Sequence, residues 1–206
     1  MCLLILGLSA SQSKAKSIEN TDICRHWDAH QTGENPLGKP LFHLVQSLTL
    51  AKYYVTDIKE IFMSSRIQSS HCPVVECAKN ALNFIIDDTV STKSMKEDMA
   101  TLLAIRKVIS EMSTSEADTF YIERLNNLKI AVNNALSSLH RALLLYAVQP
   151  TESILHPSLC SPESLEERYF RDYIILKKIE FLVSRSERKY LRCRSNLNQA
   201  NVDVLE

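Results

Sequence analysis

Along most of the chain after Pro40, apolar residues recur at alternating spacings of three and four, the period of an amphipathic α-helix. The first apolar stripe predicts a helix over residues 41–64, and three further stripes predict helices over about residues 94–112, 117–147 and 164–196. In the last helix the inward stripe is expected to consist of Leu165, Tyr169, Leu176, Ile179, Val183 and Tyr190.

Local signals mark the helix ends. The patterns Ser94-x-x-Glu97 and Ser164-x-x-Glu167 match the capping box, in which the Ser and Glu side chains satisfy free backbone N–H groups, so we expect helices to begin there. Pro150 ends the third helix. The connection before the second helix is too long for a plain loop, and residues 74–86 can form a short helix within it.

The connections between helices are long, short and long in chain order. A short connection at residues 113–116 makes the second and third helices antiparallel, and two long crossovers let the other neighbours in sequence run parallel. The prediction is an all-α fold, a long-chain four-helix bundle with up-up-down-down topology and two long crossover loops. This domain covers residues 40–196, and residues 197–206 form a C-terminal tail.

The N-terminus resembles a secretory signal peptide, because an apolar run is followed by small residues. Residues 1–13 are therefore interpreted as a signal peptide, residues 14–39 as a flexible N-terminal segment, and the protein as secreted and extracellular. The alternative is a buried N-terminal strand or helical turn. Loss of Cys2 leaves five cysteines, which allow at most two internal bridges plus one free or intermolecular thiol.

Composition narrows the function classes. The chain has 24 basic and 24 acidic residues, so no overall field draws it to nucleic acid or membranes, and its three glycines disfavour phosphate-binding loops. The basic residues from Arg185 to Arg194 complement the dipole of the last helix. No catalytic set occurs, and Cys24-x-His26-x-Asp28-x-His30 matches no standard zinc spacing. We expect no enzyme activity, no metal and no cofactor.

Apolar and aromatic residues also fall on the outer faces of three helices. On the last helix they are continued by arginines, and the outward set is Phe170, Ile174, Phe181, Arg185, Arg188 and Arg192. On the first and third helices the outward set is Phe42, Gln46, Tyr53, Ile130, Asn134, Arg141 and Leu144. Exposed stripes on several helices indicate several partner surfaces, although the long crossovers can cover some of these residues.

Two segments carry a resemblance to a known family. Residues 47–52 read Ser-Leu-Thr-Leu-Ala-Lys, and residues 173–188 read Tyr-Ile-Ile-Leu-Lys-Lys-Ile-Glu-Phe-Leu-Val-Ser-Arg-Ser-Glu-Arg. Both resemble the interleukin-27 alpha chains, a branch of the interleukin-6/interleukin-12 family of long-chain helical cytokines. Two features of that branch are absent: the acidic run between the third and fourth helices, and a tryptophan after the fourth helix that is associated with contact to the shared receptor.

The resemblance implies a secreted cytokine subunit, acting in immune regulation, that pairs with a soluble receptor-like chain of fibronectin-type domains. It also implies clustering of cell-surface cytokine receptors, including a shared signal transducer, without nucleic-acid binding or membrane insertion. The outward set of the fourth helix would then bind the partner chain, and the set on the first and third helices would bind a receptor. The alternatives are a single-chain interleukin-6-like cytokine and a non-signalling helical carrier.

Overall fold

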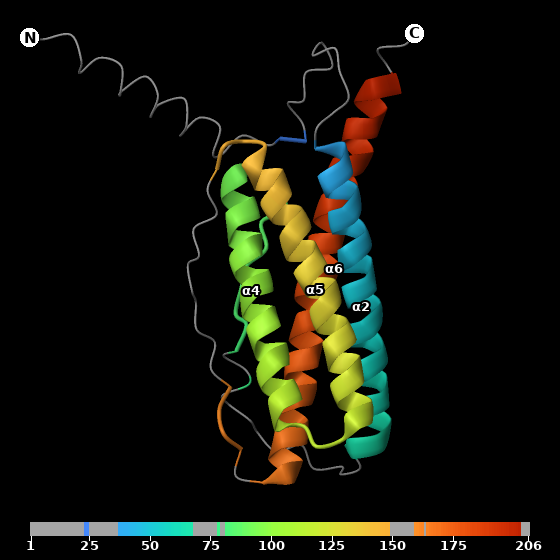
Figure 1. Ribbon diagram of the computed structural model, residues 1–206, viewed down its shortest axis with the longest axis vertical. Helices are drawn as coiled ribbons and strands as arrows, with labels where there is room; N and C mark the ends of the chain where they lie inside the picture. Colours follow the sequence, from blue (N-terminus) through green and yellow to red (C-terminus); the bar gives the residue numbers. More distant parts are fainter. Residues whose placement is uncertain are drawn as a thin grey trace, which may run out of the picture.

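The computed structural model describes residues 23–24, 37–67, 78, 81–148, 159–162 and 164–202, with side chains described as far as residue 195. Four helices form a bundle (Figure 1): α2 (Gly38–Arg66), α4 (Thr92–Ser115), α5 (Thr119–Leu144) and α6 (Leu165–Val202). The described residues contain no strand, which confirms the all-helical class. None of the described helices is long and apolar enough to cross a bilayer.

The helix boundaries follow from their caps. At α4 the prediction is wrong by three residues: Ser91 is the cap, its hydroxyl accepts from Ser94 N–H at 3.1 Å, and Ser94 Oγ accepts from Ser91 N–H at 3.0 Å. The start of α6 is confirmed, because Glu167 N–H donates to Ser164 Oγ at 3.1 Å. Asp118 caps α5 through Phe120 N–H.

The connection between α2 and α4 differs in part from the prediction. Residue 78 is helical, but residues 81–86 form a turn followed by irregular backbone, so the expected helix does not reach residue 86. The rest of that expected helix lies outside the described residues. Lys178 Nζ in α6 donates to the carbonyl oxygen of Ala81 at 2.7 Å, which places the start of residues 81–90 beside α6.

Side-chain contacts define how the helices run. Along α2, Lys52 pairs with Glu187 and Lys59 pairs with Glu180, so α2 and α6 are antiparallel. Arg66 at the end of α2 pairs with Asp118, the N-cap of α5, and Asp57 of α2 pairs with Arg124 of α5, so these two helices are also antiparallel. In Figure 1, α2 and α4 begin at the upper end of the bundle, whereas α5 and α6 begin at the lower end.

The apolar stripes form the core as expected, with one exception. Every stripe residue of α2 from Leu41 to Phe62 is buried, and so are Leu176, Ile179, Val183 and Tyr190 of α6. Leu165 is exposed, because it is the first residue of α6 and lies at the end of the bundle beyond the facing helices. Tyr169 is partly buried against the core.

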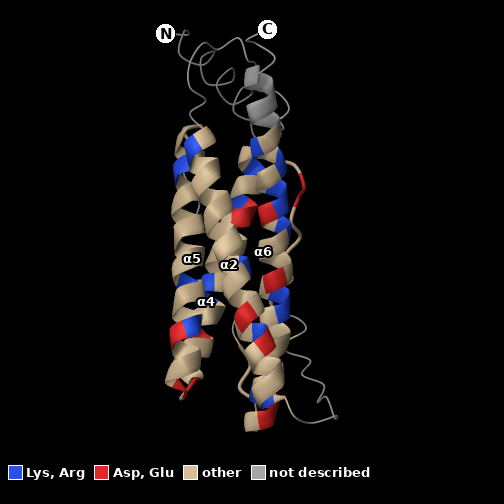
Figure 2. Cartoon of the chain, turned by 90° about the vertical axis from the view of Figure 1, so that its right-hand side faces the viewer, with Lys and Arg blue, Asp and Glu red and all other residues tan. Residues whose placement is uncertain are grey.

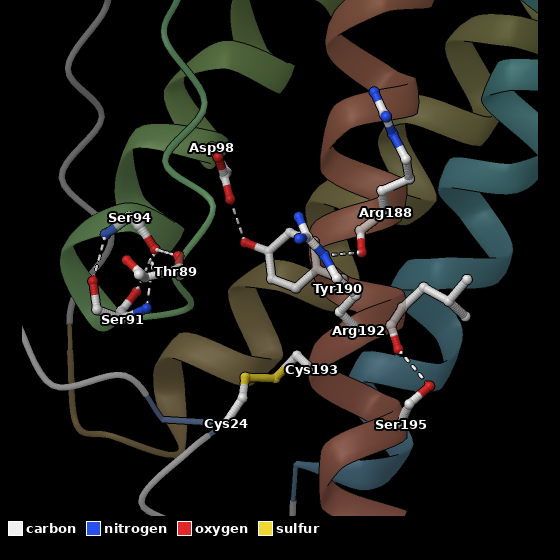
Figure 3. Close-up of a disulfide and its surroundings, with 11 residues drawn as sticks. Cys24, Thr89, Ser91, Ser94, Asp98, Arg188, Tyr190, Arg192, Cys193 and Ser195 are labelled. Carbon is white, nitrogen blue, oxygen red and sulfur yellow. Dashed lines mark hydrogen bonds between the residues drawn. A yellow bond between two sulfur atoms is a disulfide. The ribbon is translucent and has the colours of Figure 1, made fainter.

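A buried polar cluster joins α4 to α6. Lys189 Nζ lies 2.7 Å from Asp98 Oδ2, and the Tyr190 hydroxyl donates to the same oxygen (Figure 3). All three side chains are buried. Burial raises the pKa of Asp98, although Lys189 and the Tyr190 hydroxyl act in the opposite direction. The pKa of Tyr190 is also raised, mainly by burial and further by the neighbouring Asp98 carboxylate. Lys189 therefore does not belong to the exposed basic end of the helix, where the sequence analysis placed it.

A disulfide fixes the N-terminal segment to the same region. Cys24 bonds to Cys193 in α6, 169 positions away, and Ile23 N–H donates to the Val90 carbonyl oxygen at 2.7 Å. Ile23, Cys24 and Leu37 are buried and α2 already begins at Gly38, so the described residues of the segment 14–39, which was expected to be flexible, pack against the bundle or belong to it. Cys160 is also disulfide-bonded. Cys2, Cys72 and Cys77, like the His and Asp positions near Cys24, lie outside the described residues.

The first prediction concerns the buried ion pair. Lys189→Met should lower the free energy of unfolding by about 3–5 kcal/mol, because it leaves the Asp98 carboxylate buried without its cation. The matched control is Lys52→Met, which removes the cation of a half-exposed pair and should cost at most about 1 kcal/mol. Urea denaturation measures both values, and equal losses would contradict the role assigned to Lys189.

The second prediction concerns the disulfide. Replacing Cys24 and Cys193 by serine should lower the free energy of unfolding by about 2–5 kcal/mol, because the bond closes a very long loop in the unfolded chain. The measurement is the urea midpoint of the double variant against the wild type. Helix content measured by circular dichroism should stay unchanged, because the four helices retain their core. An unchanged midpoint would show that the bond adds nothing to stability.

Candidate partner-binding surfaces

The first candidate surface is a groove on the outer side of α6, here called the α6 groove. It has a volume of roughly 590 Å³ and is lined by Asp88, Phe181, Arg185, Arg188, Leu191 and Arg192. Asp88 comes from residues 81–90, and its Oδ1 lies 3.5 Å from both Arg185 Nε and Arg192 Nη2. The groove therefore combines two exposed apolar side chains with three cations and one anion.

Four of the six residues expected to bind a partner chain meet in this groove. Phe181 is 55% exposed, and Arg185, Arg188 and Arg192 lie around it. The helix backbone produces this arrangement, because residues at spacings of three, four and seven lie on one side of a helix. The sequence pattern did not single out Asp88 and Leu191 as residues of this surface. For Asp88 the reason is that an acidic residue in a connection carries no signal that it faces a helix.

The other two residues of that set lie elsewhere. Phe170 is only 5% exposed and packs against Ala78, with Ile67, Cys160 and Ile174 around it. The expectation that its ring faces a partner is therefore corrected: residues of both long connections cover it, as the sequence analysis left open. Ile174 is partly buried in the same cluster and does not line the groove.

The second candidate surface is a groove between α2 and α5, here called the α2–α5 groove. Its volume is roughly 740 Å³, and it is lined by His43, Val45, Gln46, Ser47, Thr49, Leu50, Asn134, Ser137, Ser138 and Arg141. Small hydroxyl side chains leave the space open, and several of them bond back to their own helix, as Ser138 does to the Asn134 carbonyl at 2.9 Å. Apart from Val45 and Leu50 the lining side chains are polar, and Arg141 is the one Lys, Arg, Asp or Glu among them.

Three of the seven expected receptor-binding residues, namely Gln46, Asn134 and Arg141, line this groove together. Tyr53, Ile130 and Leu144 are exposed on the same two helices, and Tyr53 is 65% exposed. Phe42 is less exposed, at 36%, and its ring contacts α6: the Arg194 guanidinium lies 4.6 Å from the ring centroid. Leu50 is also exposed and lines the groove, although the sequence pattern did not single it out as a receptor-binding residue.

A row of polar contacts between α2 and α6 separates the two grooves. Glu180 accepts hydrogen bonds from Lys59 and Thr56 at 2.7 and 2.9 Å, and Glu187 accepts from Lys52 and Thr49 at 2.8 Å. Burial alone would raise the pKa of Glu180, but the hydrogen bonds from Lys59 and Thr56 outweigh it and lower the pKa. These contacts add polar links along the length over which α2 and α6 pack against each other.

Neither groove contains a recognisable catalytic arrangement. Within the described part of the chain, no three His, Cys, Asp or Glu side chains cluster as a metal site would require. Among known proteins, no family model, no curated protein and no solved structure matches the chain. What the two grooves offer chemically is non-covalent contact, which is apolar and cationic on α6 and polar on α2 and α5.

The third prediction follows from the lowered pKa of Glu180. Its contribution to stability should be fully present above its unfolded pKa of 4.5 and disappear as the pH falls through the lower folded value. Glu180→Gln should therefore lower the unfolding free energy by about 0.2–1 kcal/mol near neutral pH, and by less near pH 3, where more of the carboxyl group is protonated. Urea titrations at both pH values test this. Exposed Glu123→Gln is the control, and a difference that does not vary with pH would contradict the prediction.

Proposed function

We propose that this protein is a secreted helical cytokine subunit of the interleukin-6/interleukin-12 family, related to the interleukin-27 alpha chains. It pairs with a soluble receptor-like chain of fibronectin-type domains and clusters cell-surface receptors that act in immune regulation. The observation that carries the proposal is the presence of two exposed grooves on separate faces of one helical bundle. A protein that brings several chains together needs separate surfaces of this kind.

The proposed topology is the up-up-down-down arrangement of long-chain cytokines, with two crossover connections. The shared starting end of α2 and α4 in Figure 1 supports it, as do the antiparallel contacts of α2 with both α5 and α6. The short link between α4 and α5, residues 116–118, also fits this arrangement. A plain up-and-down bundle would instead place α2 and α4 in opposite directions.

Secretion is part of the proposal. Disulfides form and persist in oxidising compartments, and Cys24, Cys193 and Cys160 are all disulfide-bonded. The Cys24–Cys193 bond lies in the core rather than at an exposed tip, so it is part of the packed structure. This supports a protein that matures outside the cytosol.

In the proposed mechanism the protein makes and breaks no covalent bond and needs no cofactor. The α6 groove binds the soluble receptor-like chain, with Phe181 as the apolar anchor and Arg188 and Arg192 at its rim. Aromatic and arginine side chains are the usual anchors of such interfaces, and rim charges set the association rate and specificity more than the affinity. The α2–α5 groove and the nearby Tyr53 bind a cell-surface receptor. The shared signal transducer is one candidate for this receptor.

The fourth prediction separates the two surfaces. Phe181→Ala should weaken assembly with the receptor-like chain by about 2 kcal/mol, which is roughly thirtyfold in Kd, because it truncates the anchor of the α6 groove. Tyr53→Ala should leave that assembly unchanged and reduce receptor signalling. Co-secretion with a panel of receptor-like chains, followed by size-exclusion chromatography and a cell signalling assay, measures both effects.

The control for this experiment is Met63→Ala, which removes an exposed apolar side chain of α2 that lines neither groove. It should change neither assembly nor signalling. If the chain signals alone and no receptor-like chain binds it, the single-chain cytokine replaces the heterodimer. If Phe181→Ala leaves the affinity of the folded protein unchanged, the α6 groove is not the partner surface.

A further inference from the structure

Positive charge is concentrated on one part of one helix. The whole chain has equal numbers of basic and acidic residues, but residues 177–194 of α6 contain seven Lys or Arg and only two Glu. Figure 2 shows this as blue along the half of α6 nearer the C-terminus. A neutral protein with one cationic band presents a strong local field to solvent on that side only.

Both acidic residues of this stretch point away from the outer face of α6. Glu180 and Glu187 pair with Lys59 and Lys52 of α2, and Lys189 is buried against Asp98. The outer face is left with the arginines of the α6 groove. Among the described carboxylates, Asp88 is the one that reaches them.

Arg188 is the arginine with most capacity for an added anion. Its Nε donates to the Ser184 carbonyl of its own helix at 3.3 Å, and it makes no ion pair with any carboxylate in the described part of the chain. Arg192 is 65% exposed and shares Asp88 with Arg185 at the long distance of 3.5 Å. One exposed carboxylate therefore serves two arginines, and the groove keeps an excess of guanidinium donors.

The geometry of these arginines suits a linear polyanion. Arg185, Arg188 and Arg192 follow one side of α6, and their spacing of seven residues spans about 10 Å along the helix axis. Guanidinium groups bind the oxygens of sulfate, phosphate and carboxylate in a two-pronged geometry. Three such groups in a row beside an open groove of roughly 590 Å³ offer repeated contacts to a polymer with repeated anionic groups.

We propose that the α6 groove binds a sulfated glycosaminoglycan, with Arg188 and Arg192 as its main contacts and Arg185 as a supporting one. This rests on the proposed function in one respect, because an extracellular protein meets sulfated polysaccharides as its most abundant polyanions. Clustered basic residues of this kind are the usual footprint of heparin-like ligands. Asp88 occupies part of the site, so its carboxylate competes with the incoming sulfate groups.

A polysaccharide bound in the α6 groove competes with assembly of the protein with its receptor-like chain. Phe181 lines the same groove, so a bound polysaccharide covers the surface assigned to the receptor-like chain. The two ligands then exclude one another, and polysaccharide on a cell surface or matrix holds the free subunit until a partner displaces it. Phe181 itself contributes apolar contact and no charge, so it matters for the partner chain and not for the polysaccharide.

The test is heparin-affinity chromatography of the full secreted chain with its disulfides intact. Wild-type protein should elute above about 0.15 M NaCl, and Arg188→Ala/Arg192→Ala should elute at clearly lower salt. When the heparin-binding constant is plotted against salt concentration on logarithmic axes, the slope of the double variant should be smaller by about 2. Asp88→Asn should elute later than wild type. The control, Arg106→Ala/Lys129→Ala, makes the same change in net charge with basic residues of α4 and α5 that line neither groove, and should elute with wild type.

Several outcomes would overturn the proposal. It is wrong if the double variant elutes with wild type, if the control variant falls by the same amount, or if desulfated heparin retains the protein equally well. Stronger retention on single-stranded DNA than on heparin would assign the groove to nucleic acid instead. Phe181→Ala should leave heparin elution unchanged, so a failure of the receptor-assembly experiment and a failure of this one are separate results.

Discussion

The buried pair of Asp98 and Lys189 is the contact on which the arrangement of the bundle depends. Removing two charges from water is costly, and the cost is offset only if each charge meets the other with good geometry. The pair at 2.7 Å, with the Tyr190 hydroxyl on the same oxygen, meets that condition. It therefore favours one side of α6 facing α4 and one relative position of the two helices along the bundle axis.

The outer surface of α6 follows from this constraint. If Lys189, Tyr190 and Cys193 point inward, the helical period turns Arg188 and Arg192 outward, beside the connection that carries Asp88. The disulfide to Cys24 and the hydrogen bond from Ile23 to Val90 hold the N-terminal segment over the same end. One buried ion pair thus belongs to the inward face of α6 whose opposite side carries the candidate partner surface.

The two grooves differ because their walls differ. On α6 the wall is a row of arginines with apolar side chains between them, which favours a ligand that brings anions and some apolar area. Between α2 and α5 most of the wall consists of hydroxyl and amide side chains, with Leu50 and Arg141 among them, which favours hydrogen bonds and shape over charge. The ion pairs Lys52–Glu187 and Lys59–Glu180 join α2 to α6, and none of these four residues lines either groove.

The sequence by itself determined the four helices, their inward stripes and the outward line from Phe181 to Arg192, because these depend on a period of three to four residues within one helix. Only the tertiary structure decided that Phe170 is buried and that Lys189 differs from the arginines beside it. In each case the deciding partner is distant in the sequence: Ala78 covers Phe170, and Asp98 pairs with Lys189. The local period shows which residues share a face, but whether that face is covered, and by which charge, depends on segments that meet only when the chain folds.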